Sequence, residues 1–330
     1  MKKNDYWVYK DYFIFKAEYN GSIDEYIEII SNYNKLIFSD FNDFDSFIRN
    51  IERNTSNPYC TDFYYFIGSK FNKPLSNSLD KLTGLNEIRF GTEFNIQLGN
   101  SLDKLTNLTH ITFGKNFNKP LSNSLDKLIN LTHITFGDSF NSQLGNSLDK
   151  LINLTDITFG DSFNSQLGNS LDKLTNLLNI TFGFNFNQVV EEPLDQLINL
   201  THLHFDTCFD QPISNLLFRL TNLTCLSLGC GFTQELFLPS NIKILSLDCD
   251  EQNLIDSLPN SIEQLYLGFN FNLPLDNLPS SIKKISFDEE SIYDKPLNNL
   301  PKSLEQLELP CGYTSKIINL PKNCQVDYKK

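Results

Sequence analysis

His110, His133 and Asp156 are the residues of this chain best suited to acid–base chemistry or metal binding, and they recur at even intervals along the sequence. Each follows a threonine. On neighbouring strands, their side chains would form a row with a spacing of ~4.8 Å. Imidazole and carboxylate are competent metal ligands. We nevertheless expect no metal, because no group that would orient the histidines is evident and duplication of a polar strand face explains the row.

The row is part of two columns that flank an apolar strand residue and should face outward. The third position of the repeat gives the first column, which is Glu87, His110, His133, Asp156, Asn179, His202 and Cys225. The fifth position gives the second, which is Arg89, Thr112, Thr135, Thr158, Thr181, His204 and Ser227. Aromatic side chains dominate interface energetics, so the candidate anchors for a partner are Phe184, Tyr266 and Phe269. We expect a protein partner to bind this face.

Catalytic chemistry finds little support in the sequence. A Cys225–His202 dyad would lack an orienting residue and an oxyanion loop. There is no Gly-rich phosphate loop, C-x-x-C pair, H-E-x-x-H motif or nucleophile elbow. The sequence therefore predicts a non-enzymatic protein without catalytic residues, metal or cofactor, and an enzyme is the less favoured alternative.

A repeat positions these residues. Its unit is typified by 108–130, LTHITFGKNFNKPLSNSLDKLIN, and its marker phenylalanines recur with one constant interval at Phe71, Phe94, Phe117, Phe140, Phe163, Phe186 and Phe209. A fixed period in the twenties is typical of a solenoid. Ile111 and Phe113 share the inner face of a strand, and Gly114 lets the chain turn. Ser124 could cap a helical turn over Leu125–Leu128. The apolar residues of one unit are too few to be buried alone, so stacked units must share a core.

Asparagine follows each marker phenylalanine, as at Asn118 and Asn141, with Asp210 as the exception. A buried asparagine in a turn can bond to backbone groups of its own and the neighbouring coil. We interpret the column as a structural asparagine ladder.

The chain should form one solenoid with three parts. Residues 1–61 are an N-terminal cap region of aromatic strands and short helices, with a helix over 44–53, and 1–33 lie outside the repeat. Residues 62–237 are the 23-residue repeats, in which 62–68 already fit the frame with Tyr65 and Ile67 inward. Residues 238–330 are Leu-Pro units of 20–22 residues that end in a truncated, polar C-terminal cap.

The strand pattern resembles leucine-rich repeats, and the motifs FNKPL (71–75 and 117–121) and FNLPL (271–275) resemble the FNIP subfamily, known chiefly from social amoebae and giant viruses. The resemblance covers about 62–320. It implies an α/β-type leucine-rich-repeat solenoid with a curved parallel β-sheet on the concave side, short helical turns or extended segments on the convex side, and a protein-interaction role. Some members carry an N-terminal F-box. Residues 1–60 lack a clear Leu-Pro-opened F-box pattern, and an adaptor that recruits ubiquitin-ligase components through this region is the alternative function.

Composition limits the partners and the compartment. A net charge of -13 disfavours binding to nucleic acid and to anionic membrane surfaces. The sequence contains no run of 18 apolar residues, which is the length needed to span a bilayer. Seven irregularly spaced cysteines suit a reducing compartment. Asn-x-Thr recurs at Asn107, Asn130 and Asn153, where glycans would crowd the strands of a secreted protein. We expect a cytoplasmic protein, in the host cytoplasm if it is viral.

Overall fold

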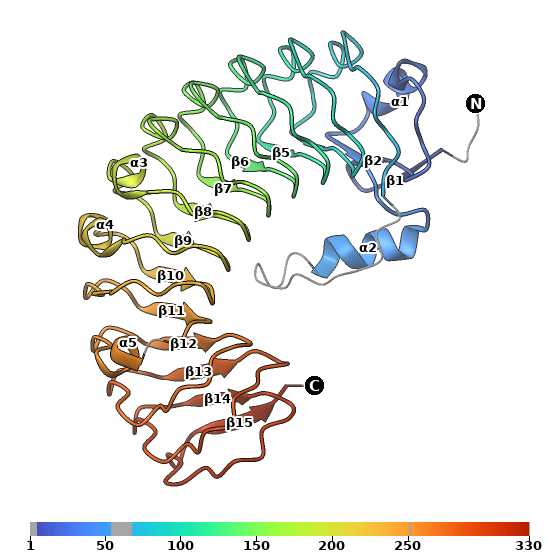
Figure 1. The fold of residues 1–330 in the computed structure, drawn as a ribbon. Coiled ribbons are helices and arrows are strands. Elements are labelled where there is room, and N and C mark those ends of the chain that lie inside the picture. Colours follow the sequence, from blue (N-terminus) through green and yellow to red (C-terminus); the bar gives the residue numbers. More distant parts are fainter. Residues whose placement is uncertain (1–4, 54–67, 251, 330) are drawn as a thin grey trace. The chain divides into compact units, whose positions relative to one another are not determined.

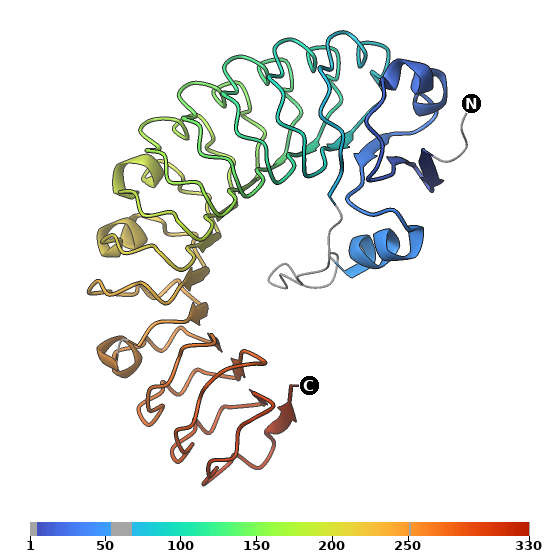
Figure 2. The ribbon, with the colours of Figure 1, turned by 45° about the vertical axis from the view of Figure 1, so that its right-hand side comes forward.

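The computed structural model describes residues 5–53, 68–250 and 252–329 (Figures 1 and 2). The chain divides into two compact units, Met1–Leu174 and Thr175–Lys330. In each unit the strands lie side by side in sequence order, and the segments between them complete the coils of a solenoid. The parallel-strand solenoid that the constant period predicts is therefore present, with little helix.

In the first unit β1 and β2 are antiparallel and the later neighbours are parallel. The register is strict, because Ile111, Ile134 and Ile157 lie opposite one another on three consecutive strands. The strands are β1 (Tyr6–Tyr9), β2 (Tyr12–Phe15), β3 (Lys35–Phe38), β4 (Glu87–Arg89), β5 (His110–Thr112), β6 (His133–Thr135) and β7 (Asp156–Thr158). The helices are η1 (Ile23–Tyr26), α1 (Ile27–Ile30) and α2 (Phe44–Arg53).

The second unit continues the pattern with parallel strands. These are β8 (Asn179–Thr181), β9 (His202–His204), β10 (Cys225–Leu228), β11 (Ile244–Leu247), β12 (Gln264–Leu267), β13 (Lys284–Phe287), β14 (Gln306–Leu309) and β15 (Gln325–Tyr328). Short helices lie between some of them, at α3 (Glu191–Leu194), α4 (Ser214–Arg219) and α5 (Gln252–Asp256).

Two phenylalanines of each coil form the aromatic part of the core in the first unit. The rings of Phe113 and Phe117 lie 4.3 Å apart within one coil, and Phe113 lies 5.5 Å from Phe136 of the next coil. Phe136 and Phe140 repeat the pair at 4.1 Å. All four side chains are buried. The strand phenylalanine and the turn phenylalanine therefore form two continuous stacked columns, as the repeat predicts.

The outer turns of the 23-residue repeats in the first unit are not helical, so the helical turn predicted over Leu125–Leu128 is wrong. The backbone makes consecutive turns instead, in which the amide of Leu128 donates to the carbonyl of Leu125 (2.9 Å). The Oγ of Ser124 is buried and has no hydrogen-bond partner in the described part of the chain. Asn, Ser and Asp compete with the helical backbone for hydrogen bonds, which explains the turns. The corresponding segments of the second unit form α3 and α4.

Glycine at the strand exit is required by close packing rather than by its backbone torsion. Gly114 is not among the residues with a positive φ. A Cβ on Gly114 would lie 1.8 Å from the carbonyl oxygen of Gly91, and a Cβ on Gly137 would lie 2.0 Å from that of Gly114. The absence of a side chain therefore allows consecutive coils to approach each other at this corner.

The asparagine column is a ladder between coils. The backbone amide of Asn118 donates to Oδ1 of Asn95 (3.0 Å), and that of Asn141 donates to Oδ1 of Asn118 (2.9 Å). In the second unit the amide of Asp210 donates to Oδ1 of Asn187 (3.0 Å). The predicted bonds are confirmed, but the predicted burial is wrong, because Asn118 and Asn141 are exposed. Water can replace such bonds, so each contributes less to stability than a buried one.

The recurring Asn-Leu-Thr segments supply two further ladders. Nδ2 of Asn130 donates to the carbonyl of Thr106 (2.9 Å) in the preceding coil. Oγ1 of Thr132 donates to the carbonyl of Thr109 (3.0 Å). Both side chains of the Asn-x-Thr pattern therefore tie one coil to the coil before it, and this structural role accounts for the pattern without glycans.

The N-terminal strands share the register of the repeat. Tyr12 on β2 lies opposite Lys35 on β3, one repeat period later, although the sequence predicts that 1–33 lie outside the repeat. Lys35 lies opposite Glu87 on β4, more than two periods further along the chain. β3 and β4 are therefore neighbouring strands, although the chain between them is longer than two repeat units. The predicted inward residues Tyr65 and Ile67 lie outside the described residues.

The long β3–β4 connection leaves the solenoid and returns to it at one point. Oδ1 of Asp40 accepts hydrogen bonds from the amides of Ser69 (2.6 Å) and Thr92 (2.8 Å). Between these points α2 packs against the outward face of β2 and β3, where Ile14 and Ile37 are buried together with Phe47. Outward residues are apolar here because a helix covers them.

Candidate functional site

The outward face of the strands carries the predicted site residues, and we call it the sheet face. In the first unit the rings of His110 and His133 stack with centroids 4.2 Å apart and planes inclined by 14°. Nε2 of His133 lies 3.2 Å from Oδ2 of Asp156. The parallel register β5–β6–β7 places the three residues directly opposite one another. The row that the sequence predicts therefore exists and its side chains are in contact.

Threonines of the coil corner hold the two histidines. Oγ1 of Thr109 lies 2.8 Å from Nδ1 of His110, and Oγ1 of Thr132 lies 2.8 Å from Nδ1 of His133. Burial, followed by the charge of His133, holds the pKa of His110 below its usual value. These orienting groups precede each histidine in the sequence, and the repeated Thr-His dipeptide was the signal that could have identified them.

A charged cluster bounds this face next to α2. Glu87 is buried on β4 and accepts from Nε of Arg89. Nζ of Lys35 lies 3.5 Å from the Glu87 carboxylate and 3.1 Å from the hydroxyl of Tyr12. The remaining predicted residues of this unit, the half-buried Thr112, Thr135 and Thr158, lie beside Arg89 on successive strands. The described sheet face thus changes from apolar under α2 to charged and then to polar.

In the second unit the sheet face begins with Asn179, Thr181, His202 and His204 on two paired strands. His202 resembles His110 and His133, since its Nδ1 lies 2.9 Å from Oγ1 of Thr201. Cys225 lies opposite His202 in the register but is buried. Thr201 thus orients His202, but the buried Cys225 thiol is poorly accessible to a substrate, which disfavours the catalytic dyad.

The three predicted aromatic anchors occupy two kinds of position in the second unit. Tyr266 lies on the sheet face in β12, and its hydroxyl donates to Oε1 of Gln264 (2.9 Å). Phe184 and Phe269 are 46% and 45% exposed and lie in the turns that follow the strands. They would therefore contact a partner at the rim of the sheet rather than on it.

The sequence columns do not include a cluster of polar and charged side chains on β13 and β14. Glu308 accepts from Nζ of Lys284 (2.7 Å) and Oγ of Ser286 (2.6 Å). Burial opposes ionisation, but these two bonds keep the pKa of Glu308 below its usual value. The sequence carries a signal for this cluster, because the Leu-Pro units place these residues at the third and fifth positions, beyond the two columns that end at Cys225 and Ser227.

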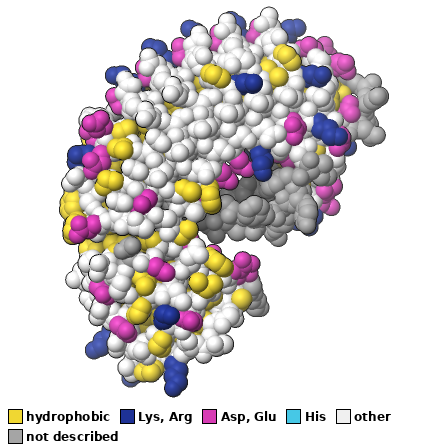
Figure 3. Space-filling model, viewed as in Figure 1, with side chains coloured by type: hydrophobic (Ala, Val, Ile, Leu, Met, Phe, Trp, Pro, Cys, Tyr) yellow, Lys and Arg dark blue, Asp and Glu magenta, His cyan; other side chains and the backbone are white. Residues whose placement is uncertain are grey.

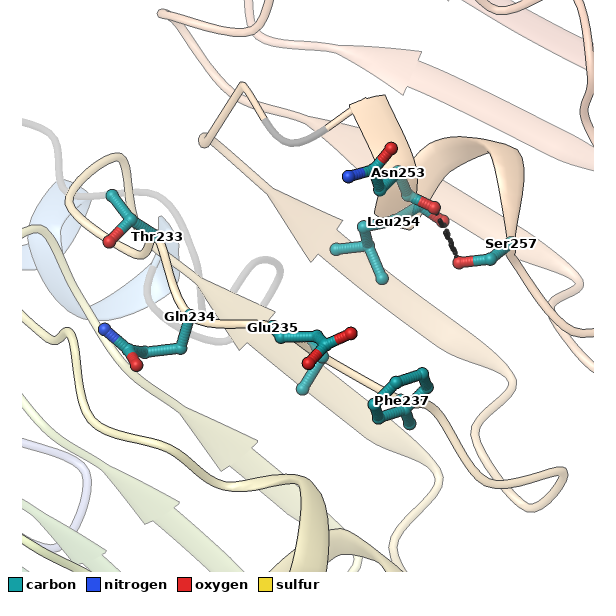
Figure 4. A pocket seen from close by; sticks show the side chains of 8 residues that line it. Thr233, Gln234, Glu235, Phe237, Asn253, Leu254 and Ser257 are labelled. Carbon is teal, nitrogen blue, oxygen red and sulfur yellow. Dashed lines mark hydrogen bonds between the residues drawn. The ribbon is translucent and has the colours of Figure 1, made fainter.

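A cavity of about 310 Å³ lies on the helical side of the second unit (Figure 4). It is lined by Leu236, Phe237 and Leu254 together with polar residues. The register step from Cys225 to Ile244 is shorter than the step from His202 to Cys225 in the preceding coil. The short coil has no helix at this position, whereas its neighbours have α4 and α5. The cavity therefore arises where the repeat length changes.

The surface in Figure 3 shows Lys, Arg, Asp and Glu side chains mixed along the outer turns of the first unit. Among the described residues, no group of three or more His, Cys, Asp or Glu side chains is arranged to hold a metal ion. No described helix has both the length and the apolar character needed to cross a bilayer.

Stability should fall on mild acidification because of His204. Its Nδ1 is buried without a hydrogen-bond partner in the described structure. Burial holds its pKa below the usual 6.5, and the charge of Asp206 only partly opposes this. Below that pH the unfolded chain takes up a proton that folded His204 does not, so stability decreases as the pH falls. Between about pH 7 and pH 5.5, the free energy of unfolding measured in urea should decrease less for His204→Asn than for the wild type. Equal decreases would contradict the assignment.

Comparison with known proteins supports the repeat family. A family model described as the FNIP repeat matches residues 232–270. A circular leucine-rich-repeat protein of a giant virus, CroV588, is 25% identical with a TM-score of 0.67, and the match covers 98% of this chain but only 51% of that protein. The chain thus spans about half the length of this similar structure.

Two more distant structures share the fold. A chain of the Toll–Spatzle complex of Drosophila is 16% identical, with a TM-score of 0.60 and coverage of 96% of this chain and 44% of that one. The internalin InlF of Listeria monocytogenes is 17% identical, with a TM-score of 0.51 and coverage of 96% and 86%. No curated protein sequence matches the chain. The family match and the fold confirm the resemblance to FNIP-type leucine-rich-repeat proteins that the Phe-Asn-x-Pro-Leu motifs indicate.

Proposed function

We propose that this protein is a non-enzymatic binding module that recognises a protein partner through its sheet face. Leucine-rich-repeat folds generally serve as protein-interaction scaffolds, and one similar structure is that of the Toll–Spatzle complex. The observation that carries the proposal is the row on β5–β7, in which Thr109 and Thr132 fix the rings of His110 and His133. Side chains that are already ordered lose less entropy when a partner binds.

The outer turns are the less suitable surface. Asp126 and Lys127 recur in successive units as the same Asp-Lys pair, so they offer a partner little to discriminate. The third-position column of the sheet face changes from Glu87 on β4 to His133 on β6 and Asp156 on β7. Specificity requires such differences.

The proposal predicts a specific loss of affinity. Replacement of His133 and Asp156 together by alanine should weaken binding of a partner isolated by pull-down by at least ~1 kcal/mol, as loss of central contacts does. Calorimetry with purified partner would measure the change, after matching melting curves confirm the fold. Asp126→Ala combined with Lys127→Ala is the control and should change affinity little. The reverse ranking would place the binding surface on the outer turns.

The ubiquitin-adaptor alternative gains no support from the described residues or the comparisons. The N-terminal region supplies β1, β2 and β3 to the sheet, so a deletion of residues 1–60 would also remove three strands of the solenoid. A test of this region needs point substitutions on the exposed side of α2 rather than a deletion.

A further inference from the structure

An exposed apolar pair lies in the turns that follow β12 and β13. Phe269 is 45% exposed and Ile292 is 52% exposed. The amide of Ile292 donates to the carbonyl of Phe269 (3.1 Å), which holds the two residues on neighbouring coils. A single exposed apolar residue needs no explanation, but two that adjoin form a surface that a partner can cover.

Carboxylates border this pair on the chain that leads to Ile292. Asp288, Glu289 and Glu290 are all exposed in the turn after β13. The amide of Glu290 donates to Oδ1 of Asp288 (3.0 Å), which shapes the turn. The carboxylates of Glu289 and Glu290 make no hydrogen bond or ion pair within the described chain. They are therefore free to bind cationic groups of a partner.

Asp248 borders the pair on the other side, in the turn after β11. Its Oδ1 accepts from the amide of Asn270 (2.7 Å), the residue that follows Phe269. Burial, and then the charges of Asp288 and Asp206, raise the pKa of Asp248 above its usual value. The carboxylates at these strand ends are therefore close enough to repel one another, and a cation placed among them would be stabilised.

The chain supplies no such cation at these turns. Residues 244–282 and 285–294 contain no lysine, arginine or histidine. The two lysines between these segments are engaged elsewhere. Nζ of Lys283 lies 2.8 Å from Glu263, which precedes β12, and Nζ of Lys284 lies 2.7 Å from a carboxylate of β14. The negative charge at the ends of β11 and β13 is therefore left for a partner to balance.

We propose that this acidic rim, formed by Phe269, Ile292, Asp248 and residues 288–290, binds a short basic segment of a partner protein. Its turns belong to three successive coils, and two strand spacings amount to ~10 Å. The rim thus fits a segment of a few residues, whose apolar side chains cover Phe269 and Ile292 and whose lysines or arginines lie against the carboxylates. Charge complementarity selects this occupant, because an acidic segment would be repelled. The acidic rim is independent of the row on β5–β7 that carries the proposed function.

The test is fluorescence anisotropy of labelled synthetic peptides with the full chain. A peptide that combines lysine with leucine should bind, whereas peptides with glutamate in place of lysine, or serine in place of leucine, should bind at least ~10-fold more weakly. Added salt should weaken binding of the lysine–leucine peptide, since exposed charges are screened. The proposal is wrong if that peptide shows no saturable binding or binds no better than the other two.

Substitutions locate the binding surface. Glu289→Gln combined with Glu290→Gln should weaken binding of the lysine–leucine peptide by at least ~5-fold and reduce its salt dependence. Phe269→Ser combined with Ile292→Ser should weaken it by at least ~10-fold. All four side chains are exposed, so both double variants should fold, and melting curves would check this.

The second unit also offers matched controls. Glu191→Gln combined with Glu192→Gln on α3 removes the same charge, and Phe218→Ser on α4 removes an aromatic side chain that is 58% exposed. Neither control should change the affinity. Equal losses in the control and rim variants would show nonspecific attraction by the net charge of -13 and overturn the proposal. Self-association that Phe269→Ser abolishes would also overturn it, because a second copy of the chain would then be the occupant.

Discussion

Phe136→Ala is expected to lower the free energy of unfolding by about 3–5 kcal/mol, the range for removal of a buried phenylalanine. Phe136 is 2% exposed. Its ring contacts that of Phe140 at 4.1 Å within the coil, and those of Phe113 and Phe159 at 5.5 Å in the coils on either side. The cavity would therefore interrupt the column of strand phenylalanines and remove its contact with the column of turn phenylalanines at Phe140. Urea unfolding followed by circular dichroism would measure the change.

The damage should spread along the solenoid, because each coil is stabilised by its neighbours. Hydrogen exchange should increase in the strands β5 and β7 beside the substituted β6. Phe184→Ala is the control, since that side chain is 46% exposed and surface changes usually stay within about 0.5 kcal/mol. Equal melting of the two variants would mean that the assigned repeat register is wrong.

The solenoid could be predicted because one spacing specifies it. The Phe-Asn marker recurs often enough to fix the phase of the 23-residue repeats, and the phase decides which of their strand residues face inward. Ile111 and Phe113 are buried for that reason. A period does not determine how the outer turns fold, since the hydrogen bonds of Leu128 and Leu131 satisfy the backbone without a helix.

The N-terminal strands were harder to place because they lack the marker. Phe38 occupies the core position of a strand phenylalanine, with its ring 6.0 Å from that of Phe90. The sequence between β3 and β4 contains the whole of α2, so the fixed period cannot be followed across it. Only the backbone pairing of Lys35 with Glu87 shows that the connection is an excursion from the coil.

The sequence predicts where the residues of the candidate site lie on the strands, but it does not predict which of their side chains are in contact. Alternation along a strand places His133 and Asp156 outward, and the constant period places them side by side. Whether they touch depends on side-chain torsions, and the torsion of His133 depends on the hydrogen bond between its Nδ1 and Oγ1 of Thr132. Burial of His204 and Cys225 also depends on packing that no period describes.

Gly137→Ala is expected to lower stability by about 3 kcal/mol, the upper end of the usual cost of overpacking. The new Cβ would lie 2.0 Å from the carbonyl oxygen and 2.5 Å from the carbonyl carbon of Gly114. A main-chain group cannot turn aside as a flexible side chain can, so the two coils must separate. That separation would strain the strand pairing between β5 and β6 and disturb the row that begins at His110.

Two glycines of the same unit separate this packing effect from the general cost of replacing glycine. Gly84 has open space around its Cβ position and no positive φ, so Gly84→Ala should be neutral or slightly stabilising. Gly145 also has open space but a φ of +52°, so Gly145→Ala should cost about 1–2 kcal/mol from backbone strain alone. Urea midpoints of the three variants should therefore rank Gly84→Ala highest and Gly137→Ala lowest. If Gly145→Ala were the least stable, backbone torsion rather than coil contact would be the stronger constraint on glycine in this solenoid.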